Sequence, residues 1–134
     1  MNNSCATWTP RVLALLRIVT GYLLLCHGTA KLFKIPHVAM FDNLPLFSLL
    51  GVAGIIELIV GALLIVGLFT RLAAFVGSGF SAAAYFIGHM APSGIFFLPM
   101  LNGGEPAVLF CFIMFYLIFA GPGAFALDDL RQNR

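Results

Sequence analysis

The sequence predicts an all-α membrane protein in which four transmembrane helices form one bundle, and three observations lead to this prediction. The chain is 61% hydrophobic and 9% charged, whereas soluble domains hold roughly 45–50% apolar and about 25% charged residues. Four apolar segments have, or nearly have, the ~20 residues that a helix needs to cross a bilayer core of ~30 Å. Turn-forming residues separate these segments. We therefore expect a single membrane domain over residues 1–134.

The expected spans are Val12 to Phe33, Leu46 to Phe69, Leu72 to Met90 and Pro106 to Ala120. The fourth is short, because 15 residues at ~1.5 Å each cover only about 22 Å. We therefore expect the preceding segment Asn102 to Gly104 to dip below the membrane surface, where non-helical backbone must be buried in protein or line a wet cavity. Ile95 to Leu101 would then fold over its mouth as a lid. Pro106 fits the first turn of the last helix, and Glu105 faces the positive end of the helix dipole.

Lysines and arginines predict the orientation. One end of a four-span arrangement holds Arg11, Arg17, Arg71, Arg131 and Arg134, and the other holds Lys31 and Lys34. Because cytoplasmic loops carry the excess of Lys and Arg, both termini are expected to be cytoplasmic. The net charge of +2 is too small to suggest a nucleic-acid partner.

Small residues recur at helical spacing on two of the expected spans, as Gly21 and Gly28 in the first and Gly54 and Gly61 in the second. Helices in lipid associate through small residues that let backbones approach closely. We expect these glycines to be packing surfaces.

Polar residues also gather on one face of each span. Glu57 lies near the middle of a hydrophobic helix, where a charged residue costs about 2.5–3.5 kcal/mol and is usually retained for a function. Counting residues inward at ~1.5 Å each places His27 and Tyr85 at a common depth of roughly 8–9 Å. Arg17 stands apart, where it can reach the cytoplasmic interface or stretch toward Glu57.

Three further residues complete this expected polar column. Lys31 lies about 3 Å inside the outer boundary, and His89 and Glu105 lie near that boundary. We expect Lys31 and Glu105 to form an ion pair that closes the outer rim of the bundle.

Several motifs resemble those of the DoxX family of small bacterial membrane proteins. They are His27-Gly28-Thr29-Ala30-Lys31-Leu32-Phe33, Glu57-Leu58 with Gly61-Ala62-Leu63-Leu64, Gly67-Leu68-Phe69-Thr70-Arg71, Gly103-Gly104-Glu105, Gly121-Pro122-Gly123 and Leu127-Asp128. The resemblance runs from about Arg11 to Asp128. Two positions depart from the family pattern: Ala126 stands where Ser is common, and Lys34 where Gly is common. We expect the second departure to change only the loop.

The resemblance implies a multi-pass protein of the bacterial cytoplasmic (inner) membrane, possessing four helices and associated with quinone-linked redox systems. A quinone site needs an apolar slot, a hydrogen-bond donor for each carbonyl and a group that supplies protons. We expect Glu57 to exchange protons and His27 and Tyr85 to donate hydrogen bonds. Substrate-binding roles are expected for Lys31, His89, Glu105, Asn102 and Arg17.

An electron carrier is not evident in the sequence, which has no flavin or nicotinamide fingerprint and no iron–sulfur cysteine pattern. His27 and His89 are expected to be hydrogen-bonded packing residues rather than haem ligands, and no metal site is expected. Redox activity would therefore require a partner oxidoreductase subunit.

Two other classes of function remain open at this level. A permease or channel for small solutes would fit the glycine-rich helices and Glu57, although four helices enclose little space and a homo-oligomer would be required. A non-catalytic membrane scaffold for a partner enzyme is the third class.

Overall fold

The structure, a computed structural model, describes residues 3–132, and every regular element in that range is helical, as predicted. The elements are α1 (Asn3–Phe33), the 3₁₀ helix η1 (Ala39–Phe41), α2 (Leu49–Val66), α3 (Thr70–Ala84), the π-helix η2 (Tyr85–Met90), α4 (Ala91–Ser93), α5 (Pro99–Asn102), α6 (Glu105–Ala120) and α7 (Leu127–Gln132).

Three helical stretches of the described chain are long and apolar enough to cross a membrane. They are Ser4–Phe33, Leu49–Val66 and Thr70–Ser93, and the last of these joins α3, η2 and α4. The fourth expected span appears as α6, a shorter apolar helix.

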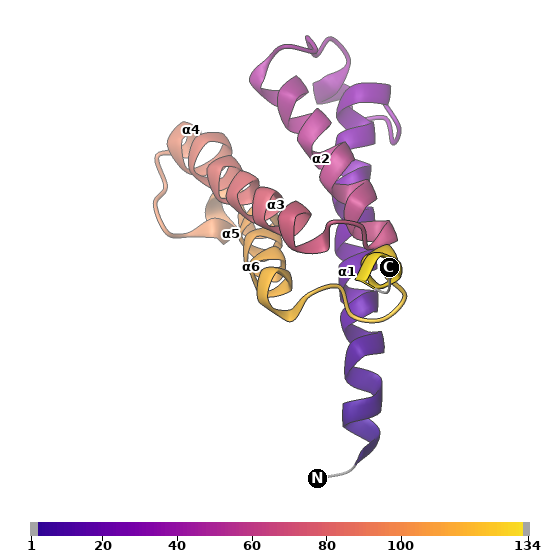
Figure 1. Cartoon of the computed structure of the whole chain (residues 1–134). Coiled ribbons are helices and arrows are strands. Elements are labelled where there is room, and N and C mark those ends of the chain that lie inside the picture. Colours follow the sequence, from indigo (N-terminus) through magenta and orange to yellow (C-terminus); the bar gives the residue numbers. More distant parts are fainter. Residues whose placement is uncertain (1–2, 133–134) are drawn as a thin grey trace.

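The long helices form two antiparallel hairpins. α2 packs along α1, and α6 packs along α3, whereas α1 and α6 touch only slightly. Figure 1 shows the α3–α6 hairpin leaning away from the α1–α2 hairpin, and the first turns of α1 projecting beyond the other helices. The arrangement is therefore more open than the single compact bundle that the sequence suggested.

Glycines bring α1 and α2 into backbone contact. A β-carbon added at Gly21 would lie 2.8 Å from the Gly61 carbonyl oxygen, and one at Gly28 would lie 2.7 Å from the Leu58 nitrogen. Such distances exclude any larger side chain unless the helices move apart. The glycine spacing on α1 and α2 therefore permits the close backbone approach through which helices associate in lipid.

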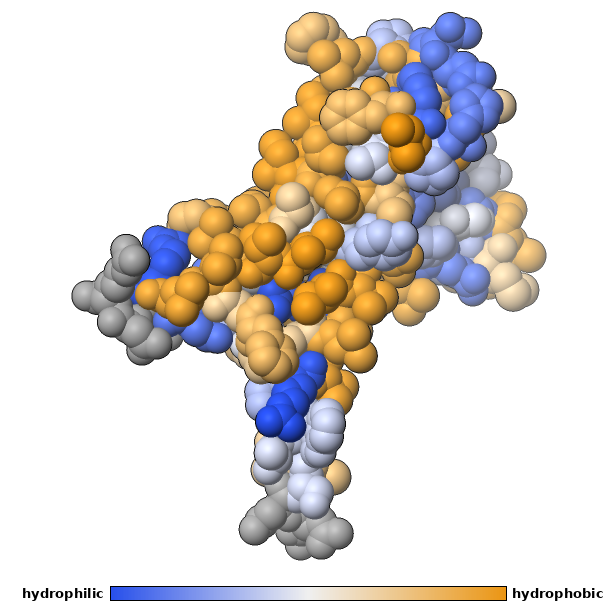
Figure 2. All heavy atoms as spheres, turned by 90° about the vertical axis from the view of Figure 1, so that its right-hand side faces the viewer, coloured by the Kyte–Doolittle hydropathy of each residue, from blue (hydrophilic) through white to orange (hydrophobic). Residues whose placement is uncertain are grey.

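The two hairpins meet at a hydrophobic cluster of residues from all four long helices: Leu24, Val60, Leu64, Ala73, Ala74, Met114 and Leu117. Outward-facing side chains are also mostly apolar. Figure 2 shows hydrophobic residues covering the middle of one face, with hydrophilic residues near its upper right and along the N-terminal part of α1. This distribution suits a helix assembly surrounded by lipid.

Turn and capping residues shift the helix ends from the expected positions. α2 begins at Leu49 rather than at residue 46, because the Ser48 hydroxyl accepts a hydrogen bond from the Gly51 N–H and donates one to the Pro45 carbonyl. It ends before Gly67, which has φ +68°. Pro106 and Glu105 lie in the first turn of α6 as predicted.

Charged residues divide between two ends of the molecule. The Ala124 N–H donates to the Pro10 carbonyl, so the segment after α6 returns to the N-terminal half of α1. We call this the clasp end, which holds Arg11, Arg17, Arg71 and Arg131; Arg134 lies outside the described residues. Lys31 and Lys34 lie at the opposite end, which we call the loop end.

Candidate functional site

Lys31 of α1 and Glu57 of α2 form a buried ion pair. The Lys31 Nζ lies 2.6 Å from each carboxylate oxygen of Glu57, and the two residues are 8% and 6% exposed. The close contact of α1 with α2 brings them together, since a β-carbon at Gly54 would lie 3.0 Å from the Lys31 β-carbon. We call Lys31 and Glu57 the buried pair.

The expected ion pair between Lys31 and Glu105 is therefore wrong. Glu105 is exposed at the start of α6, in the other hairpin. Residue counting placed both groups near one boundary but could not show that the two hairpins diverge. Lys31 is instead covered by Phe41 of η1, whose ring centroid lies 5.8 Å from the ammonium nitrogen.

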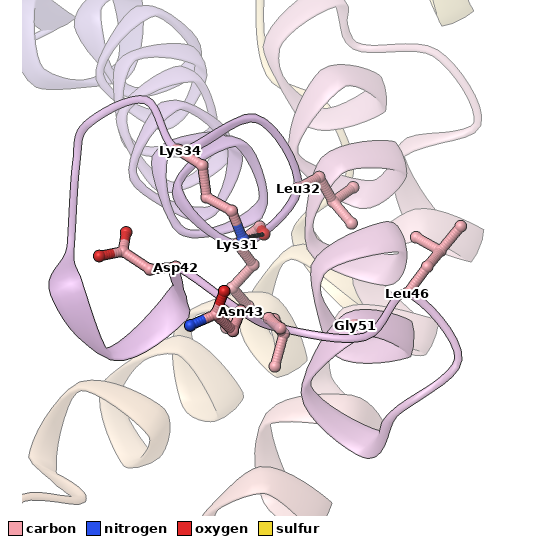
Figure 3. Close-up of a pocket in the computed structure, with 8 residues that line it drawn as sticks. Lys31, Leu32, Lys34, Asp42, Asn43, Leu46 and Gly51 are labelled. Atoms are coloured by element: carbon pink, nitrogen blue, oxygen red, sulfur yellow. Dashed lines mark hydrogen bonds between the residues drawn. The ribbon is translucent and has the colours of Figure 1, made fainter.

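A cavity of about 350 Å³ lies beside the buried pair at the loop end. We call it the loop cavity, and its lining residues are Lys31, Leu32, Lys34, Asp42, Asn43, Leu44, Leu46 and Gly51. Figure 3 shows that they come from the end of α1, the segment between α1 and α2, and the start of α2. The cavity thus combines polar side chains with leucines, next to a buried ion pair.

Two interactions hold the segment between α1 and α2 in place. The Lys34 Nζ donates hydrogen bonds to the carbonyl oxygens of Lys31 and Phe41. The His37 Nε2 lies 2.8 Å from the Asp42 Oδ1, and both of these side chains are well exposed. This segment therefore covers the buried pair. Ile95 to Leu101, the expected lid over Asn102 to Gly104, lies in the other hairpin, where the Ile95 carbonyl accepts a hydrogen bond from the Asn102 Nδ2 at 3.1 Å.

His27 lies on the side of α1 that faces α6. Its ring meets the Phe110 ring edge to face, with centroids 6.0 Å apart and planes at 89°. His27 lies one helical turn before Lys31 and is exposed.

Tyr85, His89 and Asn102 form a second cluster, which we call the Asn102 cluster. The Asn102 Nδ2 donates to the Tyr85 Oη at 3.3 Å, and the Asn102 carbonyl oxygen lies 3.3 Å from the His89 Nδ1. Its Oδ1 accepts the Gly104 N–H at 2.9 Å. The cluster belongs to the α3–α6 hairpin. None of its hydrogen bonds among the described residues involves His27, and the grouping of Tyr85 with His27 stays a prediction.

Arg17 is fully buried at the clasp end, with 0% exposure. Its guanidinium donates to the Leu64 and Ile65 carbonyls at 2.9 and 3.3 Å, and to the Ala124 and Phe125 carbonyls at 3.2 and 3.1 Å. Arg17 thus ties the end of α2 to the segment after α6. Arg17 forms no ion pair with Glu57, which pairs with Lys31 instead, and its expected role in substrate binding stays a prediction.

Asp128 completes this end of the molecule. Its carboxylate accepts the N–H groups of Phe69 and Thr70 at 2.7 and 2.8 Å, at the start of α3. Burial raises the pKa of the Asp128 carboxyl, but the hydrogen bonds from Thr70 and Phe69 and the nearby Arg131 outweigh burial, and the pKa lies below its ordinary value. The Arg71 guanidinium donates to the Ile118 and Phe119 carbonyls. We call Arg17, Arg71 and Asp128 the clasp.

Sequence reasoning missed two groups of residues. Lys34, Phe41 and Asp42 were assigned to a loop, although the departure at Lys34 was a visible signal. The capping role of Asp128 had a weaker signal, namely the Leu127-Asp128 motif, because a contact across 58 positions in the chain cannot be read from spacing.

The DoxX family model matches residues 12–90, which include the buried pair, Arg17, Tyr85 and His89. The chain belongs to the DoxX family. A Haemophilus influenzae protein described as uncharacterized is 44% identical over 128 residues, which cover 95% of this chain and 96% of that protein. No solved structure matches the chain. Membership of the DoxX family and the apolar helices make this chain a membrane protein.

Proposed function

We propose that this DoxX protein is the quinone-binding membrane subunit of an oxidoreductase system, with the buried pair as its proton-exchanging group. The observation that carries the proposal is the burial of Lys31 against both oxygens of Glu57, next to the loop cavity. Ionisable residues inside membrane helices are costly and usually mark substrate, ion or proton pathways.

The chemistry of a quinone fits the groups around the cavity. Reduction of a quinone to a quinol consumes two electrons and two protons. Glu57, held at hydrogen-bonding distance from Lys31, supplies a site that can pass a proton toward a ring oxygen and be reprotonated. Leu32, Leu44 and Leu46 provide apolar contact for the ring. The electrons come from a partner subunit in this proposal.

We extend the proposal to the membrane arrangement. α6 crosses the bilayer as a fourth span, because it packs along α3 and carries an apolar surface. The clasp end then lies in the cytoplasm, because it holds most of the arginines, and the membrane is the bacterial inner membrane.

The permease alternative gains no support from the interface between α1 and α2. Backbone contacts at Gly21 and Gly28 leave no room for a solute between these helices. Below the buried pair the hairpins close on the hydrophobic cluster around Leu64 and Met114. A bound quinone therefore fits the arrangement better than a path through it.

The test is to purify the protein in mild detergent and to identify bound molecules by absorbance and mass spectrometry. A short-chain quinone is then added, and its binding is measured by equilibrium dialysis. We expect Glu57→Gln and His27→Ala to weaken binding by about tenfold, equivalent to ~1.4 kcal/mol. Reduction of the quinone should appear only when the partner is added.

Glu105→Gln is the matched control, because it removes an equivalent charge from an exposed residue on the other hairpin. Its quinone binding should equal that of the wild type. Absence of quinone binding in the wild type, or unchanged binding in Glu57→Gln and His27→Ala, would rule out the proposed function.

A further inference from the structure

Lys34 is a non-glycine residue in the left-handed conformation, with φ +61°, directly after the last residue of α1. The β-carbon of an ordinary residue crowds the backbone in this conformation, whereas glycine adopts it freely. Glycine would therefore end α1 here at lower conformational cost. The lysine side chain offers what glycine cannot, namely hydrogen bonds to two main-chain carbonyls and a charge that lines the loop cavity.

The Lys34 ammonium is bonded only in part. It donates to two main-chain carbonyls, those of Lys31 and Phe41, and an ammonium has three N–H donors. Among the residues that the structure describes, no carboxylate oxygen lies within 4 Å of its nitrogen. Lys34 differs in this from Lys31, which contacts both oxygens of Glu57.

Other charged side chains near the loop cavity already have side-chain partners. Lys31 and Glu57 neutralise one another, and the Asp42 carboxylate accepts the His37 Nε2 at 2.8 Å. Figure 3 shows the Asp42 carboxylate pointing away from the Lys34 amine, while the Lys34 side chain lies along the cavity. The half-buried Lys34 is therefore the cavity-lining charge that lacks a carboxylate in contact.

We propose that the loop cavity selects a headgroup carrying a negatively charged oxygen, and that Lys34 is the residue that recognises it. The inference rests on the proposed quinone function and specifies the ligand as a quinone ring with an ionised oxygen. The remaining N–H of Lys34 donates to that oxygen, and the hydrogen bond gains the attraction between an ammonium and an anion, which a neutral quinone oxygen lacks. Leu44 and Leu46 contact the ring.

The test compares two probes that share a ring system and differ in charge. A hydroxynaphthoquinone whose ring hydroxyl is ionised at neutral pH is the anionic probe, and a methylnaphthoquinone is the neutral probe. Equilibrium dialysis with the full chain in detergent should show that the anion binds about tenfold more tightly or better.

Substitutions at Lys34 separate recognition from fold. Lys34→Gly removes the amine and its hydrogen bonds to the Lys31 and Phe41 carbonyls but relieves the left-handed backbone, so the preference for the anionic probe should disappear while the thermal unfolding midpoint changes little. Lys34→Gln keeps the left-handed conformation without the charge and should lose the same preference. Lys34→Arg keeps the charge and should retain it.

Two results would overturn the assignment. If Lys34→Gly lowers the unfolding midpoint and leaves the preference unchanged, the lysine serves only to cap the end of α1. If both probes bind equally to the wild type and to Lys34→Gly, the cavity does not select charge. Failure of both probes to bind the wild type is a different result, because it removes the proposed quinone function as well.

Discussion

Arg17 of the clasp and the buried pair both place charge inside an apolar helix assembly, but the charges are satisfied in different ways. Arg17 donates only to main-chain carbonyls, and Asp128 accepts main-chain N–H groups. Lys31 and Glu57 bond to each other through their side chains. The clasp also joins the end of α2, the start of α3 and the end of α6. The buried pair lies beside a cavity instead.

Under the proposed function, this difference separates structural charge from functional charge. Main-chain carbonyls at the end of α2 cannot change protonation state, so Arg17 has a fixed set of partners and a fixed role in joining elements. A lysine and a carboxylate that bond to each other can exchange a proton or accept a new partner. We therefore assign stability to the clasp and chemistry to the buried pair, and four substitutions test this division.

The largest effect is expected for Arg17→Met. The substitution leaves the carbonyls of Leu64, Ile65, Ala124 and Phe125 without their guanidinium donor. Each unsatisfied buried group lowers the free energy of unfolding by about 1–3 kcal/mol. We expect the free energy of unfolding to fall by about 4 kcal/mol or more, which is a large part of the total stability. Thermal unfolding in detergent measures it, and Arg11→Met, at an exposed arginine of the same helix, should change little. A small loss for Arg17→Met would contradict the structural role.

The next largest effect is expected for Lys31→Met, which leaves Glu57 buried without its partner. Breaking a buried ion pair from one side costs about 3–5 kcal/mol, whereas replacing both members with apolar residues is often neutral or stabilising. The double variant Lys31→Met with Glu57→Met should therefore recover stability in the same unfolding assay, yet bind no quinone. Quinone binding by a stable double variant would show that the pair is only structural.

This comparison also shows what the sequence could and could not predict. Helical periodicity, apolar length and glycine spacing predicted the helices and the glycine packing faces of α1 and α2, because those properties are local or repeat along one helix. The partner of Lys31 was mispredicted, because it depends on the angle between hairpins. The main-chain partners of Arg17 and Asp128 carry no side-chain signature at all.

The third prediction concerns the glycine contact that positions the buried pair. Gly28→Ala puts a methyl group 2.7 Å from the Leu58 nitrogen, and such overpacking costs about 1–3 kcal/mol. Because the helices must separate, we also expect weaker quinone binding. Gly79→Ala is the control: nothing lies within 4 Å of its added β-carbon, so it should stabilise α3 by up to about 1 kcal/mol. Equal stability of the two variants would mean that α1 and α2 do not pack through Gly28.

The smallest effect is expected at the clasp, for Asp128→Asn. The amide has one acceptor oxygen in place of two, so the N–H of Phe69 or of Thr70 loses its partner. We expect the free energy of unfolding to fall by about 1 kcal/mol, as it does when other helix caps are removed. The pKa of Asp128 is lowered in the folded protein, so the carboxylate's contribution is complete above the ordinary Asp value of about 3.9. It is lost as the pH falls through the lower folded value.

Unfolding midpoints of the wild type and Asp128→Asn should therefore differ at about pH 7 and converge toward about pH 3. Asp129→Asn removes the same formal charge from an exposed neighbour and should follow the wild type at both values. A difference that persists at low pH would mean that packing of the side chain, rather than its ionised oxygens, stabilises the start of α3. That result would weaken the contrast between the clasp and the buried pair, because the contrast requires Asp128 to act through main-chain hydrogen bonds to a fixed charge.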